Sequence, residues 1–288
     1  MERSKSSITS LRNRQVIEAR KLSQRKHRVR QDRFLVEGLQ LLGMAVERTR
    51  EAASGARVKP LQIFFCEELF VGETAPRLLD ALVEAGAEPI SVAAHVLDTL
   101  SDRELSQGLA GTFALTDLES SLDEIEASGP SGSSLIVLLD RLQDPGNLGT
   151  LIRTADAVGA RGVVLLEPCA DPFDPKTVRG TMGSLFSIPV TRGAPSDSLW
   201  AWLDRLGIHP VGADATEGVA AWEAKALEGS VALVLGNEAR GLSEDVRRHV
   251  ADYVALPLRG GAESLNVAVA GGVLMYEWLR VNRASARM

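Results

Sequence analysis

The sequence predicts a two-domain α/β protein whose larger, C-terminal domain holds a mostly parallel sheet. Three observations carry this prediction. Short apolar segments alternate with helical segments over residues 34–116 and again from residue 135 onward, which is the pattern of α/β domains. Residues 117–134 lose that periodicity and collect Ser, Gly, Pro and acidic side chains, as interdomain linkers do. A chain of 288 residues is long enough for each domain to bury its own core.

The smaller domain is expected over residues 31–116, after a basic N-terminal arm or helix at 1–30. FLVEGLQLLGMAVE (34–47) opens as an apolar strand and continues as an amphipathic helix. PRLLDALVEAG (76–86) has the pattern of a helix that ends at its glycine C-cap. Together with the apolar stretches VKPLQIFFCEEL and GTFALTD, these segments predict a small α/β fold.

The larger domain is expected over residues 135–288, beyond the linker at 117–134. Apolar strands separated by helices predict a sheet that helices cover on both faces, with ligands bound in the loops that follow the strands. The expected strands are LIVLLD, GVVLLE, HPVGAD, VALVLG and YVALPL, and the expected helices are GNLGTLIRTADAVGA, SLWAWLDRLG, WEAKALEG, SEDVRRHVA and the final segment.

Composition indicates a soluble globular protein. Hydrophobic residues make up 45% of the chain and no apolar run approaches the ~20 residues that span a bilayer, so no membrane partner is expected. The N-terminus is basic and polar and has no apolar leader, which favours a cytoplasmic location. Cys66 and Cys169 lie far apart without zinc spacing, so we expect a reducing compartment and no metal site.

Charge is distributed unevenly along a chain whose net charge is −6. Residues 1–33 hold eleven Lys and Arg against three Asp and Glu, whereas residues 34–133 hold six against seventeen. A basic segment on an acidic body fits an electrostatic contact with nucleic-acid phosphate. A solvated tail without a partner is the alternative explanation of the same charge pattern.

Three loops after predicted strands combine glycine with polar side chains. The first, at 140–147, leads into a helix with Asn147 at its start, where that side chain is expected to cap backbone donors. The second, at 236–241, places Asn-Glu between two glycines, and the third, at 258–266, runs directly into an Ala/Val/Gly helix. Glycines in such loops let backbone approach a ligand closely. Each loop alone also fits an ordinary strand–turn–helix connection, and no dinucleotide or P-loop pattern occurs.

In this order, LDRLQDPGNLGTLIRTADAVGARG, LVLGNEARGLSEDV and LPLRGGAESLNVAVAGGVLMYEW resemble the SpoU/TrmH family of SPOUT methyltransferases. The intermediate stretch DPKTVRGTMGSLFSIPV and the start of the smaller domain are also similar to that family, whose substrate-binding domain has a ribosomal-protein-like α/β fold. The resemblance implies transfer of a methyl group from S-adenosylmethionine to a ribose 2′-hydroxyl of RNA. It also implies a trefoil knot in the C-terminal domain and a homodimer whose active sites draw on both subunits.

The resemblance assigns the site residue by residue. Arg153, about two turns into the first helix, matches the family's catalytic arginine. Because the pKa of arginine exceeds about 12, we expect it to hold a phosphate or stabilise developing alkoxide charge rather than act as a base. Glu238 is expected to orient the site or take the proton. The implied catalytic set is Asn147, Arg153, Glu238, Ser264 and Asn266, and the implied cofactor-binding set is Leu235, Gly236, Asn237, Glu238, Gly241, Leu256, Leu258, Ser264 and Leu265.

Two departures from common patterns accompany these assignments. The four histidines all fall outside the three segments, so the usual general base is missing. Ala268 stands where the family often has a second serine, which removes one hydroxyl contact. The expected contacts with the RNA backbone are the basic residues Arg12, Arg14, Arg20, Lys21, Arg25, Lys26, Arg28, Arg30 and Arg179; for Arg179 a plain surface charge is an equal alternative.

The two-domain form resembles members directed at ribosomal RNA more than the short members directed at tRNA. The sequence thus predicts a ribosomal RNA ribose 2′-O-methyltransferase, with a tRNA-directed enzyme as an alternative. A catalytically silent RNA-binding protein of the same fold is a second alternative. A base methyltransferase of the wider knotted superfamily is a third, although the NxGxxxR pattern of the first segment favours ribose chemistry.

Overall fold

The computed structural model describes residues 7–51, 58–101, 106–127, 132–193 and 196–283. The first six residues of the expected basic arm and residues 128–131 of the expected linker lie outside the described residues. The chain forms two compact units. The first contains Met1–Leu118 together with Phe173–Phe186, and the second contains Glu119–Pro172 and Ser187–Met288.

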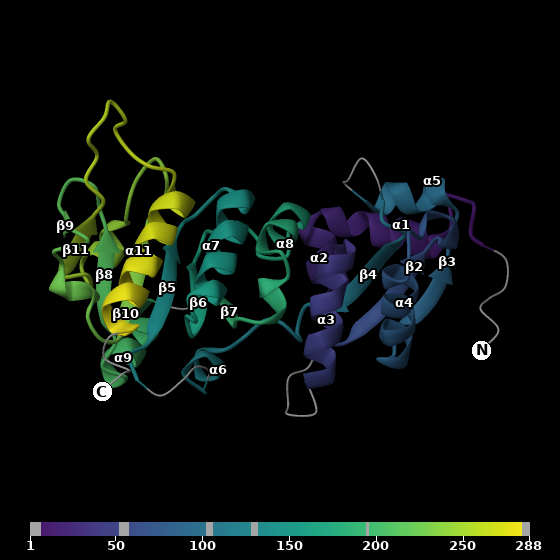
Figure 1. Cartoon of the computed structure of the whole chain (residues 1–288), viewed down its shortest axis with the longest axis horizontal. Coiled ribbons are helices and arrows are strands. Elements are labelled where there is room, and N and C mark those ends of the chain that lie inside the picture. The colour runs from purple at the N-terminus through teal and green to yellow at the C-terminus, as the bar shows by residue number, and fades with distance from the viewer. Residues whose placement is uncertain (1–6, 52–57, 102–105, 128–131, 194–195, 284–288) are drawn as a thin grey trace. The chain divides into compact units, whose positions relative to one another are not determined.

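The first unit is built on a four-stranded sheet in the order β1-β4-β2-β3 (Figure 1). Strands β1 and β2 run antiparallel to β4, and β3 runs parallel to β2. The strands are β1 (Arg33–Glu37), β2 (Pro60–Phe65), β3 (Glu88–Ser91) and β4 (Leu109–Ala114). Its helices are α1 (Arg14–Arg20), α2 (Arg25–Gln31), α3 (Leu39–Glu51), α4 (Thr74–Glu84), α5 (Ala94–Leu97) and α8 (Pro175–Thr181), with short 3-10 turns η1 (Lys21–Ser23), η3 (Glu67–Leu69), η4 (Asp98–Leu100) and η5 (Ser184–Phe186).

Local sequence explains several of these elements. The strand and helix expected over 34–47 are present as β1 and α3. Helix α4 ends as expected, because Gly86 takes a φ of 105° that a residue with a Cβ rarely adopts. The basic N-terminal segment forms α1 and α2 rather than one continuous helix. Val16 and Ala19 of α1 are buried in the core of this unit, so the described part of the segment is integral to the fold.

Residues 173–186 come after the expected strand GVVLLE of the larger domain, yet they pack within the first unit. Phe173 lies 5.0 Å from Phe34 of β1, measured between ring centroids, and Phe186 lies 5.5 Å from Phe113 of β4. All four rings are buried. Burial of four aromatic side chains in one cluster is a large apolar contribution, which explains why this excursion belongs to the smaller sheet.

The second unit holds a seven-stranded sheet in the order β7-β6-β5-β10-β8-β11-β9, and every neighbouring pair is parallel. This confirms the α/β fold with a mostly parallel sheet. Its strands are β5 (Leu135–Asp140), β6 (Gly162–Leu166), β7 (Val190–Arg192), β8 (His209–Ala213), β9 (Val219–Ala220), β10 (Val231–Leu235) and β11 (Asp252–Ala255). Its helices are α6 (Leu122–Ala127), α7 (Pro145–Ala157), α9 (Ser196–Arg205), α10 (Glu244–Arg247) and α11 (Val267–Arg283), with the 3-10 turn η6 (Lys225–Leu227).

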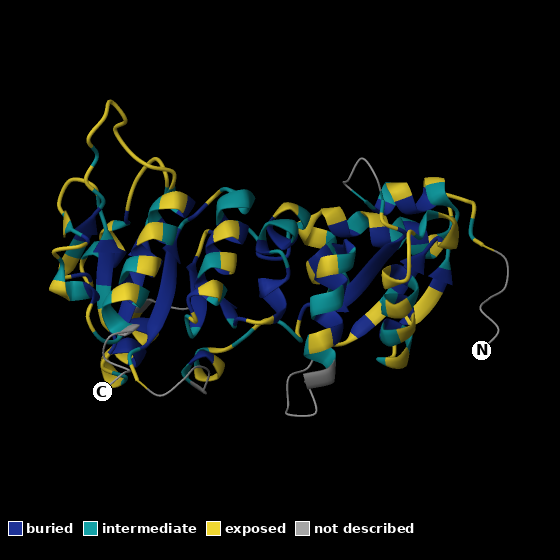
Figure 2. Cartoon of the chain, in the orientation of Figure 1, coloured by how far each residue is buried: buried dark blue, intermediate teal, exposed yellow. Residues whose placement is uncertain are grey.

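Helices cover both faces of this sheet, as its buried strands require. Ile136 and Leu138 of β5 point into a core that Leu199 and Leu203 of α9 also enter. Helices α7 and α11 lie side by side across the sheet (Figure 1). The central strands β5, β6 and β10 are buried along their whole length, whereas α7 and α11 alternate between buried and exposed residues (Figure 2).

Two expectations about secondary structure were wrong. WEAKALEG, expected as a helix, contains only the 3-10 turn η6. The expected linker carries α6, whose Ile125 is fully buried in the same core as α9. Ile125 contacts the sheet where Gly162 begins β6, because a Cβ at Gly162 would lie 2.7 Å from the Ile125 side chain. A six-residue helix with one apolar anchor is too short for its periodicity to show in sequence.

The strand order positions the loops of interest. From β5 the chain proceeds outward through β6 and β7 on one side, and the remaining strands lie on the other side beginning with β10. The sheet therefore has a topological switch point between β5 and β10, the place where open α/β sheets bind ligands. Leu139 and Leu235 pair in register at the ends of these strands, so the loops that follow them are neighbours. The trefoil knot stays a prediction.

Candidate active site

All nine residues expected to bind the cofactor line one cavity of about 260 Å³, here called the cofactor cavity. The cavity lies beyond the carboxyl ends of β8, β10 and β11, and α11 contributes Ala270 and Leu274. Leucines supply much of its wall, which Asp214 also borders. The expected residues in this wall are Leu235, Gly236, Asn237, Glu238, Gly241, Leu256, Leu258, Ser264 and Leu265.

The loop after β10 is a rigid turn. Asn237 and Gly241 exchange two backbone hydrogen bonds of 3.0 and 2.9 Å. The Asn237 side-chain oxygen accepts from the backbone N–H groups of Ala239 and Arg240. A Cβ at Gly236 would lie 2.4 Å from the carbonyl carbon of Gly241, so only glycine permits this closure. Glycine is therefore required at position 236 because its backbone packs directly against the backbone of Gly241.

Glycines in the third loop behave differently. A Cβ at Gly260 or Gly261 would meet nothing within 4 Å, and neither has a positive φ. No protein neighbour therefore requires glycine at these two positions, and the expected approach of their backbone to a ligand stays a prediction. Close approach occurs instead at Gly271 in α11, where a Cβ would lie 2.6 Å from side-chain carbons of Leu151 and Leu235. That glycine lets α11 press against α7 and β10.

Three of the expected catalytic residues form a hydrogen-bonded cluster, here called the polar relay. The Asn266 amide nitrogen donates to the Asn147 amide oxygen at 3.0 Å, and the Asn147 amide nitrogen donates to Glu238 Oε1 at 3.0 Å. Asn266 also accepts from the backbone N–H of Ala268 and so caps α11. The three residues come from the segments at 140–147, 236–241 and 258–266, which follow the carboxyl ends of β5, β10 and β11 at one edge of the parallel sheet.

Asn147 does not cap α7, contrary to expectation. Asp144 is the capping residue, and its carboxylate accepts from the Asn147 backbone N–H at 2.8 Å. Pro145 follows as the first helical residue, a position that suits its missing N–H. Because Asp144 satisfies the helix end, the Asn147 side chain is available for the polar relay.

Arg153 and Ser264 lie outside the polar relay. Ser264 lines the cofactor cavity. Arg153 is exposed on α7 and, within the described residues, forms no ion pair or hydrogen bond. It lies seven residues after Gly146, two helical turns, and so shares a face with it. Gly146 borders a broad groove between α7 and α11, which places Arg153 at the edge of that groove.

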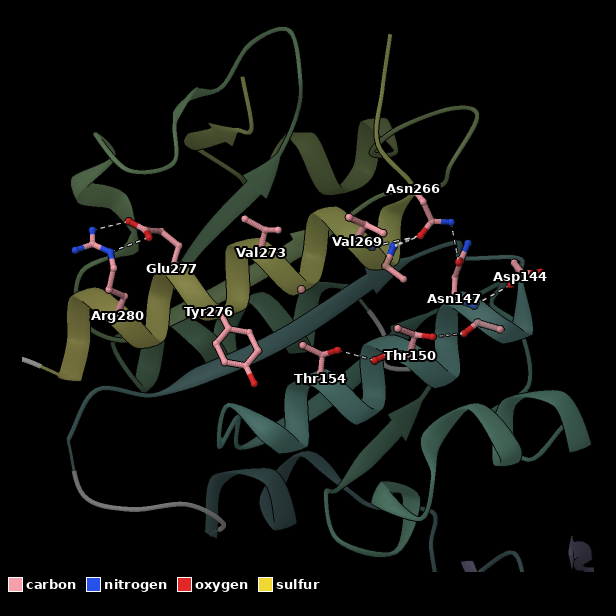
Figure 3. A pocket seen from close by; sticks show the side chains of 13 residues that line it. Asp144, Asn147, Thr150, Thr154, Asn266, Val269, Val273, Tyr276, Glu277 and Arg280 are labelled. Atoms are coloured by element: carbon pink, nitrogen blue, oxygen red, sulfur yellow. Dashed lines mark hydrogen bonds and ion pairs between the residues drawn. The ribbon is translucent and has the colours of Figure 1, made fainter. Parts of the chain in front are cut away.

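The groove between α7 and α11 has a volume of about 980 Å³ (Figure 3). Val269, Val273 and Tyr276 project from α11 toward it and are about half exposed. Thr150 and Thr154 line the α7 side, and both hydroxyls donate to carbonyls of their own helix. Asn147 and Asn266 of the polar relay stand at one end of the groove (Figure 3).

One expected RNA contact is wrong. The Arg28 side chain is 2% exposed and donates through Nη1 to the backbone carbonyls of Leu22 and Ser23. Asp174 lies 3.7 Å from its other terminal nitrogen. A guanidinium buried among these partners cannot reach an RNA phosphate, so Arg28 is a structural residue.

For the other basic residues, contact with RNA stays a prediction, and their ion pairs and exposure differ. Lys21 pairs with Glu18 at 2.7 Å, and Arg179 pairs with the buried Glu37 at 3.1 Å while staying 29% exposed. The six residues on the exposed surface of this segment are Arg12, Arg14, Arg20, Arg25, Lys26 and Arg30.

The buried Cys169 thiol is unsuited to act as a nucleophile. Burial raises the pKa of the Cys169 thiol to about 11, and its Sγ donates to two backbone carbonyls, so a thiolate nucleophile is not available there. No group of three or more His, Cys, Asp and Glu residues that could hold a metal ion occurs in the part of the chain that the structure describes. No described helix is long and apolar enough to cross a membrane.

The loop after β8 was missed by sequence reasoning. Ala213, Asp214 and Ala215 line the cofactor cavity, and Asp214 bonds to Arg247 of α10. HPVGAD was recognised as a strand, but strand order is a property of the whole sheet. Only the position of β8 between β10 and β11 shows that its loop faces the same cavity.

The fold and this cavity define an α/β protein with a ligand site at the switch point of a parallel sheet and a polar relay at its edge. Residues 134–276 match the model of the SpoU rRNA methylase family, and residues 13–111 match an MRM3-like substrate-binding domain. The chain belongs to the SpoU rRNA methylase family. This confirms the family inferred from the three segments.

Two relatives show how far the similarity extends. A 23S rRNA (guanosine(2553)-2′-O)-methyltransferase of Bacillus subtilis, RlmP, is 32% identical over 93% of this chain and 97% of its own length. A 23S rRNA (uridine(2479)-2′-O)-methyltransferase of Streptomyces viridochromogenes is 33% identical over 92% of this chain and 88% of its own. Both alignments include the smaller domain as well as the larger one.

A solved structure agrees with these relatives. An AdoMet-bound rRNA methyltransferase from Sinorhizobium meliloti superposes with a TM-score of 0.81 at 32% identity and covers 96% of this chain and 97% of its own. The two-domain architecture is therefore shared along nearly the whole chain.

Proposed function

We propose that this protein is an S-adenosylmethionine-dependent methyltransferase that methylates a ribose 2′-hydroxyl in ribosomal RNA of the large subunit, and that it acts in the cytoplasm. The observation that carries the proposal is the polar relay of Asn266, Asn147 and Glu238 at the edge of the cofactor cavity. Family membership supports the reaction, and the named relatives, both of which modify 23S rRNA, support the substrate.

The cofactor cavity suits S-adenosylmethionine in the chemistry of its wall. Leu256, Leu258 and Leu265 offer apolar surface for an adenine, and the backbone beside them offers hydrogen-bond partners. Glu238 supplies a carboxylate that favours a cationic ligand, whereas the Asp214 carboxylate is already paired with Arg247. When bound, this cofactor supplies an electrophilic methyl group.

The polar relay prepares the acceptor. The carboxylate of Glu238, which lines the cofactor cavity, is held by the Asn147 amide, and that amide is itself held by Asn266. A carboxylate fixed in this way can accept the proton of a ribose hydroxyl or orient that hydroxyl toward the cavity. Because much of the rate of an in-line displacement comes from positioning, loss of either amide should lower turnover more than cofactor affinity.

The groove between α7 and α11 supports the homodimer. Three exposed apolar side chains, Val269, Val273 and Tyr276, form a continuous stripe on α11, and a surface of that kind is typical of an interface. Arg153 stands at the edge of this groove, away from the polar relay of its own chain. We propose that a second copy covers the groove and that Arg153 of each copy completes the other copy's site. A Val273→Glu variant should then sediment as a monomer and lose activity while still binding cofactor.

The test of function is methylation with labelled S-adenosylmethionine and 23S, 16S or transfer RNA, followed by digestion to nucleosides. We expect label in a 2′-O-methylnucleoside of 23S rRNA. An Asn147→Ala variant should lower the rate by about a hundredfold with little change in cofactor affinity. Asp156→Ala, on the same helix but outside both the polar relay and the groove, is the matched control and should retain activity.

Each alternative has its own outcome in the same experiment. Label in tRNA alone would indicate a tRNA-directed enzyme. Label in a base would show that the ribose assignment is wrong. RNA binding without label in any fraction would indicate a catalytically silent RNA-binding protein. Mapping 2′-O-methyl positions in cells with and without the gene would then identify the nucleotide, because the two named relatives modify different ones.

A further inference from the structure

A second cavity adjoins the polar relay and has no assigned ligand. It has a volume of about 520 Å³ and lies between Arg141, Gln143 and Pro168 on one side and residues 237–240 on the other. We call it the arginine cavity, because Arg141 and Arg240 are its two cations. Glu238 lines this cavity and the cofactor cavity alike. A ligand in the arginine cavity would therefore meet the same carboxylate that borders the cofactor.

Arg141 is held in an unusual backbone conformation. Its φ is 57°, in the left-handed region that residues with a Cβ rarely adopt. Its backbone N–H donates to the Leu166 carbonyl, and its own carbonyl accepts from the side chains of Asn237 and Gln143. Such a conformation persists only when surrounding bonds over-determine it, and it is found most often at functional sites.

The Arg141 side chain is also oriented in advance. Its Nε lies 3.2 Å from the carboxylate of Asp140, and its Nη2 donates to the Gly241 carbonyl at 3.4 Å. The same Asp140 carboxylate accepts from the Ser243 backbone N–H at 2.5 Å and is 3% exposed. The buried carboxylate thus fixes the guanidinium and leaves Nη1 as a donor for a ligand.

Arg240 supplies the second cation. It lies on the rigid turn that Asn237 holds together, and its own backbone N–H donates to the Asn237 side chain at 3.1 Å. Arg240 is exposed, and within the described residues no carboxylate pairs with it. An arginine without an ion-pair partner favours an anionic ligand. Two guanidinium groups on one cavity match the charge and the oxygen geometry of a phosphate.

We propose that the arginine cavity binds the phosphodiester backbone of RNA next to the ribose that is methylated. The inference rests on the proposed function, because it takes the acceptor to be RNA. It adds a binding site for the substrate within the catalytic unit, separate from the basic residues of α1 and α2. Arg141 and Arg240 act as positioning residues: phosphate contacts fix the register of the strand, and the ribose then lies against Glu238.

The test compares Arg240→Gln with Arg205→Gln in the full-length protein. Both changes remove one exposed arginine from the second unit, and Arg205 is 57% exposed in an ion pair with Glu126 of α6. Three quantities are measured for each: affinity for S-adenosylmethionine by calorimetry, affinity for a 23S rRNA fragment as a function of salt, and kcat/KM for methylation of that fragment.

We expect Arg240→Gln to leave cofactor affinity unchanged and to reduce the magnitude of the slope of log K against log salt by about 0.7, the value for one lost phosphate contact on a single strand. Its kcat/KM should fall by about tenfold or more, as for a lost hydrogen bond to a charged group. Arg205→Gln should match the wild type in all three. Arg141→Lys, which keeps the charge but not the planar fork, should lower kcat/KM while keeping the salt slope.

Failures of the two proposals are distinguishable. If the wild type methylates the RNA and Arg240→Gln equals Arg205→Gln in slope and rate, the arginine cavity is not a phosphate site and the function stands. If Arg240→Gln loses cofactor affinity, Arg240 acts through the cofactor cavity and the inference is overturned. If the wild type methylates no RNA, the proposed function fails, and the salt slopes of the two variants still decide whether Arg240 contacts phosphate.

Discussion

Asp214 offers a quantitative test of how the loop after β8 is held beside the cofactor cavity. Its Oδ1 accepts from the Thr216 backbone N–H at 2.9 Å and from the Thr216 hydroxyl at 2.7 Å, and its Oδ2 accepts from Arg247 Nη2 at 2.7 Å. Burial alone would raise the pKa of the Asp214 carboxyl. These hydrogen bonds, with another from the Glu217 backbone, outweigh burial and lower its pKa from 3.8 to about 2.

The lowered pKa translates into stability with a definite sign. A carboxyl whose pKa is lower in the folded state stabilises that state fully above its unfolded pKa and ceases to do so as pH falls through the folded value. For a fall from 3.8 to about 2, the contribution to the free energy of unfolding is about 2.4 kcal/mol at pH 7. At pH 3 it is about half of that, and it disappears below pH 2. The Asp214 side chain is only 13% exposed, so screening by solvent does not remove it.

The assay is urea unfolding of Asp214→Asn and wild type at pH 7, 4 and 3, followed by tryptophan fluorescence. All four tryptophans (Trp200, Trp202, Trp222 and Trp278) lie in the second unit, so the signal reports on that unit. We expect the variant to be about 2 kcal/mol less stable at pH 7 and at pH 4, with a smaller difference at pH 3. Asp245→Asn, which removes a 75% exposed carboxylate from neighbouring α10, should change stability by less than about 0.5 kcal/mol. A difference that is absent at pH 7, or identical at all three pH values, would refute the reasoning.

Two further predictions test the site and the correction to it. Gly236→Ala should weaken S-adenosylmethionine binding by at least about tenfold in calorimetry, because its Cβ must displace the backbone of Gly241 in the cavity wall; Gly260→Ala, whose Cβ meets nothing within 4 Å, is the control, and equal losses would contradict the assignment. Arg28→Met should destabilise the first unit by about 2–4 kcal/mol, because buried carbonyls lose their donor, without changing the salt dependence of RNA binding. Lys26→Gln, on the exposed side of α2, should leave stability unchanged and reduce the salt dependence of RNA binding. If Arg28→Met instead reduced the salt dependence and left stability unchanged, Arg28 would be an RNA contact.

Periodicity predicted the elements that many buried residues define. LIVLLD coincides with β5 and VALVLG with β10 to within one residue, because every side chain in these strands is buried and nothing competes with the apolar signal. Elements that depend on one or two contacts were missed. Helix α6 rests on Ile125, and the segment WEAKALEG has a helical composition but forms the turn η6. In both cases tertiary packing, which a local pattern does not contain, decided the structure.

Among the polar side chains too, local sequence indicated some roles, whereas tertiary contacts decided others. Resemblance placed Asn147, Glu238 and Asn266 in one site, and the structure joins them by hydrogen bonds. It did not reveal that Asp144 takes over the helix cap and thereby releases Asn147, because Asp and Asn are both good caps and sequence offers no way to choose. Arg28 was grouped with its neighbours by charge, yet a helix has an inner face, and one arginine of α2 lies on it.

The switch point explains why the cofactor cavity and the arginine cavity share residues 237–239. Because β5 and β10 are neighbours while their crossovers lead in opposite directions, the loops after them meet at one edge of the sheet. The turn after β10 then has two sides: Gly236 borders the cofactor cavity, Arg240 borders the arginine cavity, and residues 237–239 border both. A methyl donor and a phosphodiester bound in these cavities would each contact the same five-residue turn. Under these proposals, the rigidity of that turn, which depends on Asn237 and on the absence of a Cβ at Gly236, would set the alignment of donor and acceptor on which an in-line transfer depends.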